Sequence, residues 1–264
     1  MLEVKDLRVK FHKRERCAVD GVSFSIEDGG ILGLVGESGS GKTVTAMAVS
    51  GLLSRAKATA TGQVLLDGVD LLTLPEAELE QRRGKDIGVV FQEPMSAMNP
   101  LLRVGAQVEE ALRVHTTLSR PQRRAQAIAA LGDAELQDPE TVYDKYPHEL
   151  SGGMLQRAMI AAAIVTRPRL LLLDEPTTAL DVTIQAQILT LLRKLNQEQG
   201  IAMLFISHNL SVVKKLCGRV AVMQRGRLVE EGDTEQIFLS PQADYTRRLI
   251  AAIPTRNRNE SASE

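Results

Sequence analysis

The stretch ILGLVGESGSGKT, residues 31–43, decides the fold of this 264-residue chain. Its first five residues are apolar and predict a buried strand, and the residues from Lys42 onward favour a helix. Between them lies the pattern G-x-x-x-x-G-K-[ST], in which Gly36, Gly39 and Gly41 let backbone N–H groups approach an anion closely. A helix that begins at such a turn adds its N-terminal amides and its dipole. The stretch therefore predicts a cradle for the phosphates of a nucleotide.

Two side chains of this stretch carry further chemistry. The Lys42 ammonium is expected to bind the β- and γ-phosphates, and the Thr43 hydroxyl to bind Mg²⁺, which prefers oxygen ligands. The alternative, a flexible glycine-rich loop, does not explain the strand and the helix on either side. The residues expected to bind the nucleotide here are Gly36, Glu37, Ser38, Gly39, Ser40, Gly41, Lys42 and Thr43.

A second pattern, LLLLDEP at residues 170–176, ends an apolar run with two adjacent carboxylates. Such a run is typical of a buried parallel strand. Buried charges are costly unless a cation or a polarised water compensates them. We therefore expect Asp174 to contribute to a magnesium site and Glu175 to activate the water that attacks the γ-phosphate. The alternative interpretation is that the pair caps a following helix.

A third pattern, LSGGMLQR at residues 150–157, places a Ser-Gly-Gly turn directly before an apolar helical stretch. It predicts a second anion site at a helix N-terminus. Together the three patterns resemble those of the ATP-binding cassette (ABC) ATPases, and the resemblance covers residues 2–254. It implies that the ATP held by one subunit is contacted by the signature residues of another. In this chain the signature residues are Ser151, Gly152, Gly153 and Met154.

The resemblance also implies roles for residues outside these patterns. Phe11, which ends an alternating segment, would stack on adenine, and the alternative is a core residue of an edge strand. Gln92 would complete the magnesium site with Thr43 and Asp174, and would respond to a membrane partner. Asp181 would reach across to the opposite ATP site.

Glu175, His208 and Lys42 are the residues that the resemblance makes catalytic. His208 would touch the γ-phosphate, whereas a histidine after a strand would otherwise be a capping or surface group. Two residues depart from the commonest family pattern, Met154 in place of glutamine and Thr178 in place of serine. Neither change removes a catalytic group, so we expect this subunit to supply functional halves to both sites of a dimer.

Composition favours a soluble cytosolic protein. With 44% hydrophobic residues the chain can bury one large core, and its net charge of −1 offers no bulk attraction to nucleic acid. No apolar run approaches the roughly 20 residues that cross a bilayer, and the N-terminus lacks a signal-peptide core. Cys17 and Cys217 have no metal-ligand spacing and are expected to be free thiols in a reducing compartment.

The order of the patterns predicts an α/β fold. We expect a P-loop NTPase (RecA-like) core with a mostly parallel sheet, an antiparallel β lobe and an inserted α-helical subdomain. Within one ATPase domain (1–254), the expected parts are the nucleotide-binding core (1–92 and 161–232), the helical signature subdomain (93–160) and a C-terminal helical segment (233–254). Residues 255–264 are expected to form a disordered polar tail. Turn signals at residues 27–30 and 66–68 predict hairpins.

Four further stretches narrow the resemblance to importer ATPases for dipeptides, oligopeptides and nickel. They are QEPMSAMNP (92–100), YPHEL (146–150), TTALDVTIQ (177–185) and YTRRLIAAIP (245–254). Peptides are the first choice of cargo. Nickel or a metal chelate is the alternative, which the lack of a cysteine-bearing extension favours slightly.

The resemblance implies partners as well as cargo. They are a second ATPase subunit, two membrane permeases and an extracytoplasmic substrate-binding protein, with no nucleic acid. We expect the second ATPase to be non-identical, although the sequence leaves a copy of this chain open. The implied location is the cytoplasmic face of the inner membrane.

Two functions of other classes compete with transport. A non-transport ABC ATPase that acts on nucleic acid would need a long coiled coil or a second cassette, and no heptad pattern persists in this sequence. A P-loop kinase or GTPase would leave residues 151–153 and His208 without a role. Salt-dependent DNA binding, or phosphate transfer to an acceptor other than water, would favour these rivals.

Overall fold

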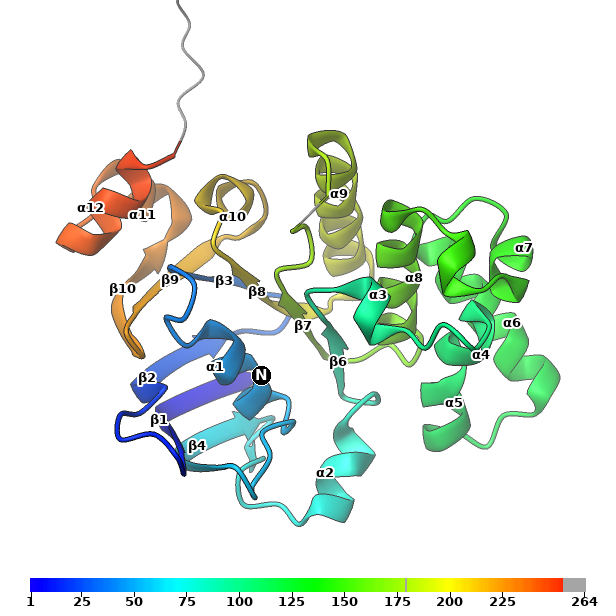
Figure 1. Cartoon of the computed structure of the whole chain (residues 1–264), viewed down its shortest axis with the longest axis horizontal. Coiled ribbons are helices and arrows are strands. Elements are labelled where there is room, and N and C mark those ends of the chain that lie inside the picture. Colours follow the sequence, from blue (N-terminus) through cyan, green and yellow to red (C-terminus); the bar gives the residue numbers. More distant parts are fainter. Residues whose placement is uncertain (179, 254–264) are drawn as a thin grey trace, which may run out of the picture.

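The structure of the protein is a computed structural model that describes residues 1–178 and 180–253. Two sheets and a group of helices make up this part of the chain (Figure 1). The predicted tail, residues 255–264, lies outside the described residues.

The larger sheet has six strands in the order β10-β9-β3-β8-β7-β6. Its strands are β3 (Ile31–Val35), β6 (Ile87–Val90), β7 (Leu170–Asp174), β8 (Ala202–Ser207), β9 (Arg219–Gln224) and β10 (Arg227–Asp233). Neighbours from β9 to β6 pair in parallel, while β10 pairs antiparallel with β9. All leucine, phenylalanine and isoleucine side chains of β7 and β8 are buried. This burial is expected for a parallel sheet that is covered on both faces.

Successive side chains of these strands enter two different hydrophobic clusters. Leu171 and Phe205 pack with the helices that follow the sheet strands, whereas Leu172 and Leu204 pack with the smaller sheet. The parallel sheet is therefore the middle layer of the fold, with an apolar core on each face.

The smaller sheet is antiparallel, in the order β2-β1-β4-β5. Its strands are β1 (Leu2–Phe11), β2 (Val19–Ile26), β4 (Ala58–Leu66) and β5 (Val69–Asp70). The hairpin predicted at residues 66–68 forms between β4 and β5, with Asp67 and Gly68 in left-handed conformations. The hairpin predicted at residues 27–30 is wrong, because there the chain crosses from β2 to β3 in the larger sheet. Because β3 is an apolar strand, it is more stable buried in the parallel sheet than paired with β2 in a hairpin.

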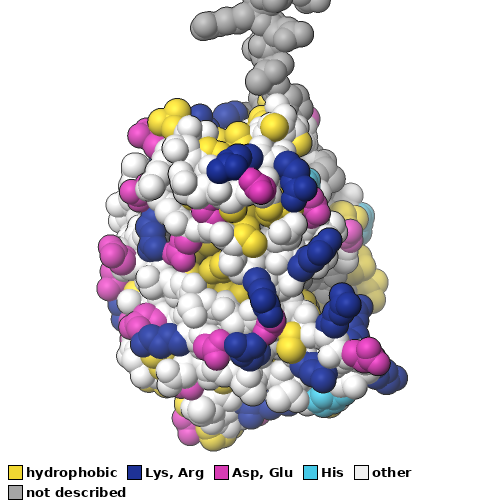
Figure 2. Space-filling view, turned by 90° about the vertical axis from the view of Figure 1, so that its left-hand side faces the viewer, with side chains coloured by type: hydrophobic (Ala, Val, Ile, Leu, Met, Phe, Trp, Pro, Cys, Tyr) yellow, Lys and Arg dark blue, Asp and Glu magenta, His cyan; other side chains and the backbone are white. Residues whose placement is uncertain are grey.

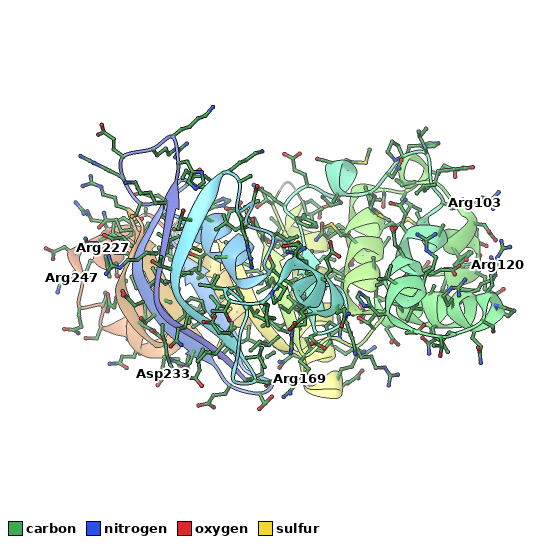
Figure 3. The ribbon with its side chains drawn as sticks, turned by 90° about the horizontal axis from the view of Figure 1, so that it is seen from below. Arg103, Arg120, Arg169, Arg227, Asp233 and Arg247 are labelled. Atoms are coloured by element: carbon green, nitrogen blue, oxygen red, sulfur yellow. The ribbon has the colours of Figure 1, made fainter. Side chains whose placement is uncertain are left out.

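Between β6 and β7 the described residues form helices, at the opposite end of the molecule from β10 (Figure 1). They are α3 (Pro94–Ala97), α4 (Val104–Val108), α5 (Glu110–His115), α6 (Arg120–Asp133), α7 (Pro139–Asp144), the 3₁₀ helix η1 (Pro147–Glu149) and α8 (Gly152–Ile164). Figure 3 shows Arg103 and Arg120 at this end, and Arg227 and Arg247 at the other. The signature helix α8 packs against α6 in one cluster with the parallel sheet.

The other helices cover the sheets or follow them. They are α1 (Lys42–Val49), α2 (Glu76–Arg82), α9 (Val182–Gln199), α10 (Leu210–Leu216), α11 (Thr234–Leu239) and α12 (Asp244–Ala251). The apolar stripe of α9 is buried, and the helix ends at Gly200 in a left-handed conformation. Among the described residues, no helix combines the length and the apolar character that a membrane span needs.

Candidate active site

Most of the predicted site residues follow strands of the parallel sheet. The phosphate loop, residues 36–41, follows β3, and Gln92 follows β6. Asp174 ends β7, and His208 follows β8. Because these strands run parallel, their carboxyl ends meet at one edge, which is where open α/β sheets bind ligands.

The phosphate loop has a shape that its glycines make possible. A Cβ at Gly36 would lie 2.1 Å from the carbonyl oxygen of Met223, so the neighbouring β9 leaves no room for a side chain. Gly41 has a φ of 112°, and a Cβ there would lie 2.6 Å from the carbonyl oxygen of Ala18. The helix α1 begins at the next residue, Lys42, so its N-terminal amides adjoin the loop.

The Lys42 side chain folds back over the loop. Its Nζ donates to the carbonyl oxygens of Gly36 at 2.8 Å and Glu37 at 2.9 Å. Burial lowers the pKa of Lys42, while the carboxylates of Glu175 and Asp174 oppose that shift. The ammonium is therefore poorly solvated, which strengthens its attraction to a phosphate.

Thr43 and Asp174 join the phosphate loop to β7. The Thr43 hydroxyl donates to Oδ1 of Asp174 at 3.3 Å. Burial raises the pKa of Asp174; the Thr43 hydroxyl opposes this, and the Glu175 charge adds to it. A divalent cation beside these oxygens would compensate the buried charge, and oxygen ligands are those that Mg²⁺ prefers. The residues present thus fit the magnesium site expected from the sequence.

Three side chains meet at the Glu175 carboxylate. Its Oε2 lies 3.2 Å from Nε2 of Gln92, 3.0 Å from Nδ1 of His208 and 2.9 Å from Oγ1 of Thr178. The backbone of Glu175 is left-handed, with a φ of 49°, and its N–H donates to the carbonyl oxygen of Ile206. This backbone state and its hydrogen bond fix the position of Glu175 at the end of β7. The arrangement leaves a carboxylate at the sheet edge that can orient a water and accept its proton.

The signature residues lie on another element. Ser151 caps α8, and its hydroxyl accepts from the N–H of Met154 at 3.3 Å. A Cβ at Gly153 would lie 2.9 Å from Cγ2 of Ile184, so α8 approaches α9 closely there. Among the described residues, no hydrogen bond joins Ser151, Gly152, Gly153 or Met154 to the phosphate loop. Within one chain the described signature residues therefore make no hydrogen bond to the phosphate loop, and Figure 1 shows α8 apart from α1, the helix that follows this loop.

Two other predicted residues have structural contacts. Asp181 caps α9, where its carboxylate accepts from the N–H groups of Thr183 at 3.0 Å and Ile184 at 2.9 Å. Phe11 ends β1 half-buried, and the guanidinium of Arg14 lies 5.8 Å from its ring centroid. Their proposed contacts with nucleotide stay predictions.

Two contacts at the site had no clear signal in the sequence. In the sequence, Thr178 was noted only because it departs from the commonest family pattern. In the structure its hydroxyl donates to the Glu175 carboxylate. The Tyr245 hydroxyl accepts from the N–H of Glu37 at 3.0 Å, across 208 positions of sequence. No spacing rule links residues so far apart. The sequence singled out Tyr245 only as the first residue of YTRRLIAAIP (245–254), a stretch that narrowed the family resemblance without indicating a contact with the phosphate loop.

The phosphate loop, its buried lysine and the carboxylates at the same sheet edge define an ATPase of the P-loop class. Comparisons with known proteins narrow that class. The family model described as ABC transporter matches residues 19–178. The chain belongs to the ABC transporter family, which confirms the resemblance found in its motifs.

Several relatives match almost the whole chain. The peptidoglycan transport ATP-binding protein YejF of Agrobacterium fabrum is 49% identical over 96% of this chain and 47% of its own length. The oligopeptide transport ATP-binding protein OppD of Bacillus subtilis is 44% identical, over 97% of this chain and 72% of its own length. The glutathione import ATP-binding protein GsiA of Escherichia coli O157:H7 is 43% identical, over 96% of this chain and 42% of its own length. The chain thus spans less than half the length of two of these relatives.

Solved structures show the same fold. The ATP-binding cassette MJ0796, described as a dimeric post-hydrolysis state bound to ADP and Pi, has a TM-score of 0.79 and 30% identity, covering 89% of this chain and 99% of that chain. The protein cbiO1 of Clostridium perfringens, described as part of the ABC transporter complex cbiONQ, has a TM-score of 0.77 and 27% identity, covering 90% of each chain. These similarities confirm the fold class predicted from the sequence.

Proposed function

We propose that this chain is the ATP-hydrolysing subunit of a membrane importer whose cargo is a peptide. The observation that carries the catalytic part is the Glu175 carboxylate, which Gln92 and His208 contact at the same sheet edge as the phosphate loop. The cargo is proposed from the relatives, which are named for oligopeptides, peptidoglycan and glutathione. Since none of these three is named for nickel, the sequence-based alternative of nickel or a metal chelate is not favoured.

The phosphate loop and Lys42 would bind the triphosphate. Loop N–H groups and the helix α1 face the phosphate oxygens, and the Lys42 ammonium leaves the Gly36 and Glu37 carbonyls to bind the β- and γ-phosphates. Its charge stabilises the oxygens of the transferring phosphoryl group. Phe11 is proposed to stack on the adenine.

The opposite side of the site would supply the water. Glu175 orients the attacking water and accepts its proton, and His208 holds the Glu175 carboxylate and contacts the γ-phosphate. Mg²⁺, when bound by Thr43, Gln92 and Asp174, supplies positive charge to the phosphate oxygens. The protein contributes position and charge, and no covalent intermediate is needed.

A second ATPase subunit would complete each site. Ser151 and Gly152 are exposed at the N-terminus of α8, away from the phosphate loop of the same chain. We therefore propose that they contact ATP held by the second subunit, and that Asp181 lies at the same interface. The second subunit is proposed to be a related, non-identical chain.

The surface beside Gln92 is proposed to contact two membrane permeases. Large apolar side chains are exposed there: Phe91, Met95, Leu101 and Leu102. Phe91 also lines a cavity of about 290 Å³, together with Met98 and residues of α8. Apolar surface of this kind marks an interaction site. An external substrate-binding protein and a location at the cytoplasmic face of the inner membrane complete the proposal.

Glu175→Gln tests the catalytic proposal. The amide keeps the shape of the side chain but cannot accept the proton of the water. We expect phosphate release to fall at least about a hundredfold, while ATP affinity changes less than about twofold. Glu78→Gln, an exposed carboxylate on α2, is the matched control. Unchanged turnover in Glu175→Gln would remove Glu175 from the catalytic role.

The cargo needs a separate experiment. Cells that lack the gene for this subunit would be supplied with the wild-type gene or with Glu175→Gln, and uptake of a labelled oligopeptide and of nickel would be measured. Peptide uptake restored by the wild-type gene alone supports the proposal. If the wild-type gene restored nickel uptake but not peptide uptake, nickel would replace the peptide as the proposed cargo. The proposed ATPase role would not be affected.

A further inference from the structure

The C-terminal helix α12 reaches the phosphate loop through one side chain. Tyr245 is 5% exposed, and its hydroxyl accepts from the backbone N–H of Glu37 at 3.0 Å. Figure 1 shows α12 beside α11 and β10, at the end of the molecule away from the signature helix. The ABC transporter family model, which matches residues 19–178, does not reach this helix.

The helix α12 is fixed firmly enough to hold Tyr245 in place. Glu230 of β10 accepts from the N–H groups of Gln242 at 2.7 Å and Ala243 at 3.0 Å, directly before α12. Burial of Glu230 acts to raise its pKa, but these hydrogen bonds outweigh it and the pKa is lowered. Thr246, next to Tyr245, is fully buried. The phenol therefore sits on a helix whose start is tied to the parallel sheet.

The Gly36–Glu37 peptide unit links Tyr245 with Lys42. Its N–H donates to Tyr245, and its carbonyl oxygen, which is that of Gly36, accepts from Nζ of Lys42 at 2.8 Å. The next carbonyl oxygen, that of Glu37, accepts from Nζ of Lys42 at 2.9 Å and from the N–H of Ser40 at 3.2 Å. Glu37 itself is exposed, so little packing holds this part of the loop. Tyr245, a buried residue of α12, thus anchors the loop segment whose carbonyl oxygens bind Lys42.

We propose that Tyr245 is a positioning residue for ATP binding: its hydroxyl holds the Glu37 peptide and so keeps the phosphate loop and Lys42 in the geometry that receives a triphosphate. This role rests on the proposed function, in which the loop binds ATP. Without the hydroxyl the loop gains conformations that must be excluded when nucleotide binds, so affinity falls while the reacting groups stay intact. The effect appears in KM and not in kcat.

Tyr245→Phe isolates the hydroxyl, and Tyr143→Phe is a matched control. Tyr143 is also buried, at 8% exposure, and its hydroxyl bonds to Glu109 in the helical end of the molecule. The dissociation constant for the non-hydrolysable analogue adenosine 5′-(β,γ-imido)triphosphate, KM for ATP and kcat would be measured for the wild type and both variants. We expect Tyr245→Phe to raise the dissociation constant and KM about two- to tenfold, the effect of one hydrogen bond, with kcat within about twofold. Tyr143→Phe should leave all three unchanged.

Hydrogen exchange of the Glu37 amide gives a second readout that does not depend on nucleotide. The amide should exchange slowly in the wild type and in Tyr143→Phe, and faster in Tyr245→Phe. Wild-type protein that binds no nucleotide would refute the proposed function. Normal wild-type binding together with an unchanged dissociation constant in Tyr245→Phe would refute only the role of Tyr245, as would an equal shift in Tyr143→Phe or a Glu37 amide that exchanges freely in the wild type.

Discussion

Replacing Thr178 by valine tests whether the hydrogen bonds around Glu175 matter for hydrolysis. Oγ1 of Thr178 donates to Oε2 of Glu175 at 2.9 Å, and valine removes this bond with little change of shape. Gln92 and His208 still contact the same oxygen, so Glu175 stays near its place but with more freedom. Among the described residues, Thr178 makes no hydrogen bond with the phosphate loop, so ATP affinity should not change.

The size of the effect follows from the surroundings of the bond. A hydrogen bond to a charged group contributes about 1.5–3 kcal/mol, and the full value applies where water cannot replace the lost donor. Thr178 is exposed, so water compensates in part and the lower end of the range applies. Since about 1.4 kcal/mol is tenfold in rate, we expect kcat to fall by about tenfold.

The assay is steady-state phosphate release at saturating ATP, with ATP affinity measured in parallel. Thr178→Ser keeps the hydroxyl and should retain most of the wild-type kcat. Thr73→Val is the matched control, because its hydroxyl donates to the carbonyl oxygen of Asp70, away from the sheet edge. Wild-type turnover in Thr178→Val, or a fall in Thr178→Ser as large as in the valine variant, would refute the reasoning.

Two further predictions concern the charges of the site. Lys42→Ala should weaken ATP binding roughly ten- to hundredfold in a titration, since it removes charge-assisted bonds to phosphate, and an affinity equal to that of the exposed-lysine control Lys57→Ala would contradict the assignment. Burial raises the pKa of Asp174 above its value in the unfolded chain. Above the raised pKa the carboxyl is ionised in the folded protein, which lowers the free energy of unfolding. At a pH well below both pKa values the carboxyl is neutral in both states and this destabilisation is absent. Asp174→Asn, without Mg²⁺ and nucleotide, should therefore melt at a higher temperature than the wild type at about pH 7, and the difference should shrink towards about pH 4. An equal or lower melting temperature at the neutral pH would argue against a desolvated carboxylate.

The core of the site could be predicted because its signals are local. The glycines of the phosphate loop act through their own backbone, and the carboxylates of LLLLDEP directly end the apolar run that became β7. Once the parallel sheet is inferred, its geometry brings the strand ends to one edge without any knowledge of side-chain contacts. The same local reasoning failed at residues 27–30, where the turn joins two sheets and the burial of β3 decides the topology.

Contacts across the fold could not be predicted in this way. Tyr245 and Glu37 are in contact because β10 places α12 beside the phosphate loop. No periodicity or spacing in the sequence predicts that placement. Asp181 shows a related limit: as an N-cap of α9 it is explained by helix chemistry alone, so its capping bonds neither support nor oppose an interface role.

The contacts of Glu175 give the proposed coupling to a membrane partner a definite physical route. Gln92 directly follows Phe91, a residue that is 47% exposed, and a partner that packs on this apolar surface would also move Gln92. The bond from Gln92 to Glu175 is 3.2 Å long, so a displacement of about 1 Å would break it. His208 and Thr178 would then orient the carboxylate, which changes where it can hold a water. In this proposal one side chain, Gln92, would connect partner contact with hydrolysis without a movement of the parallel sheet.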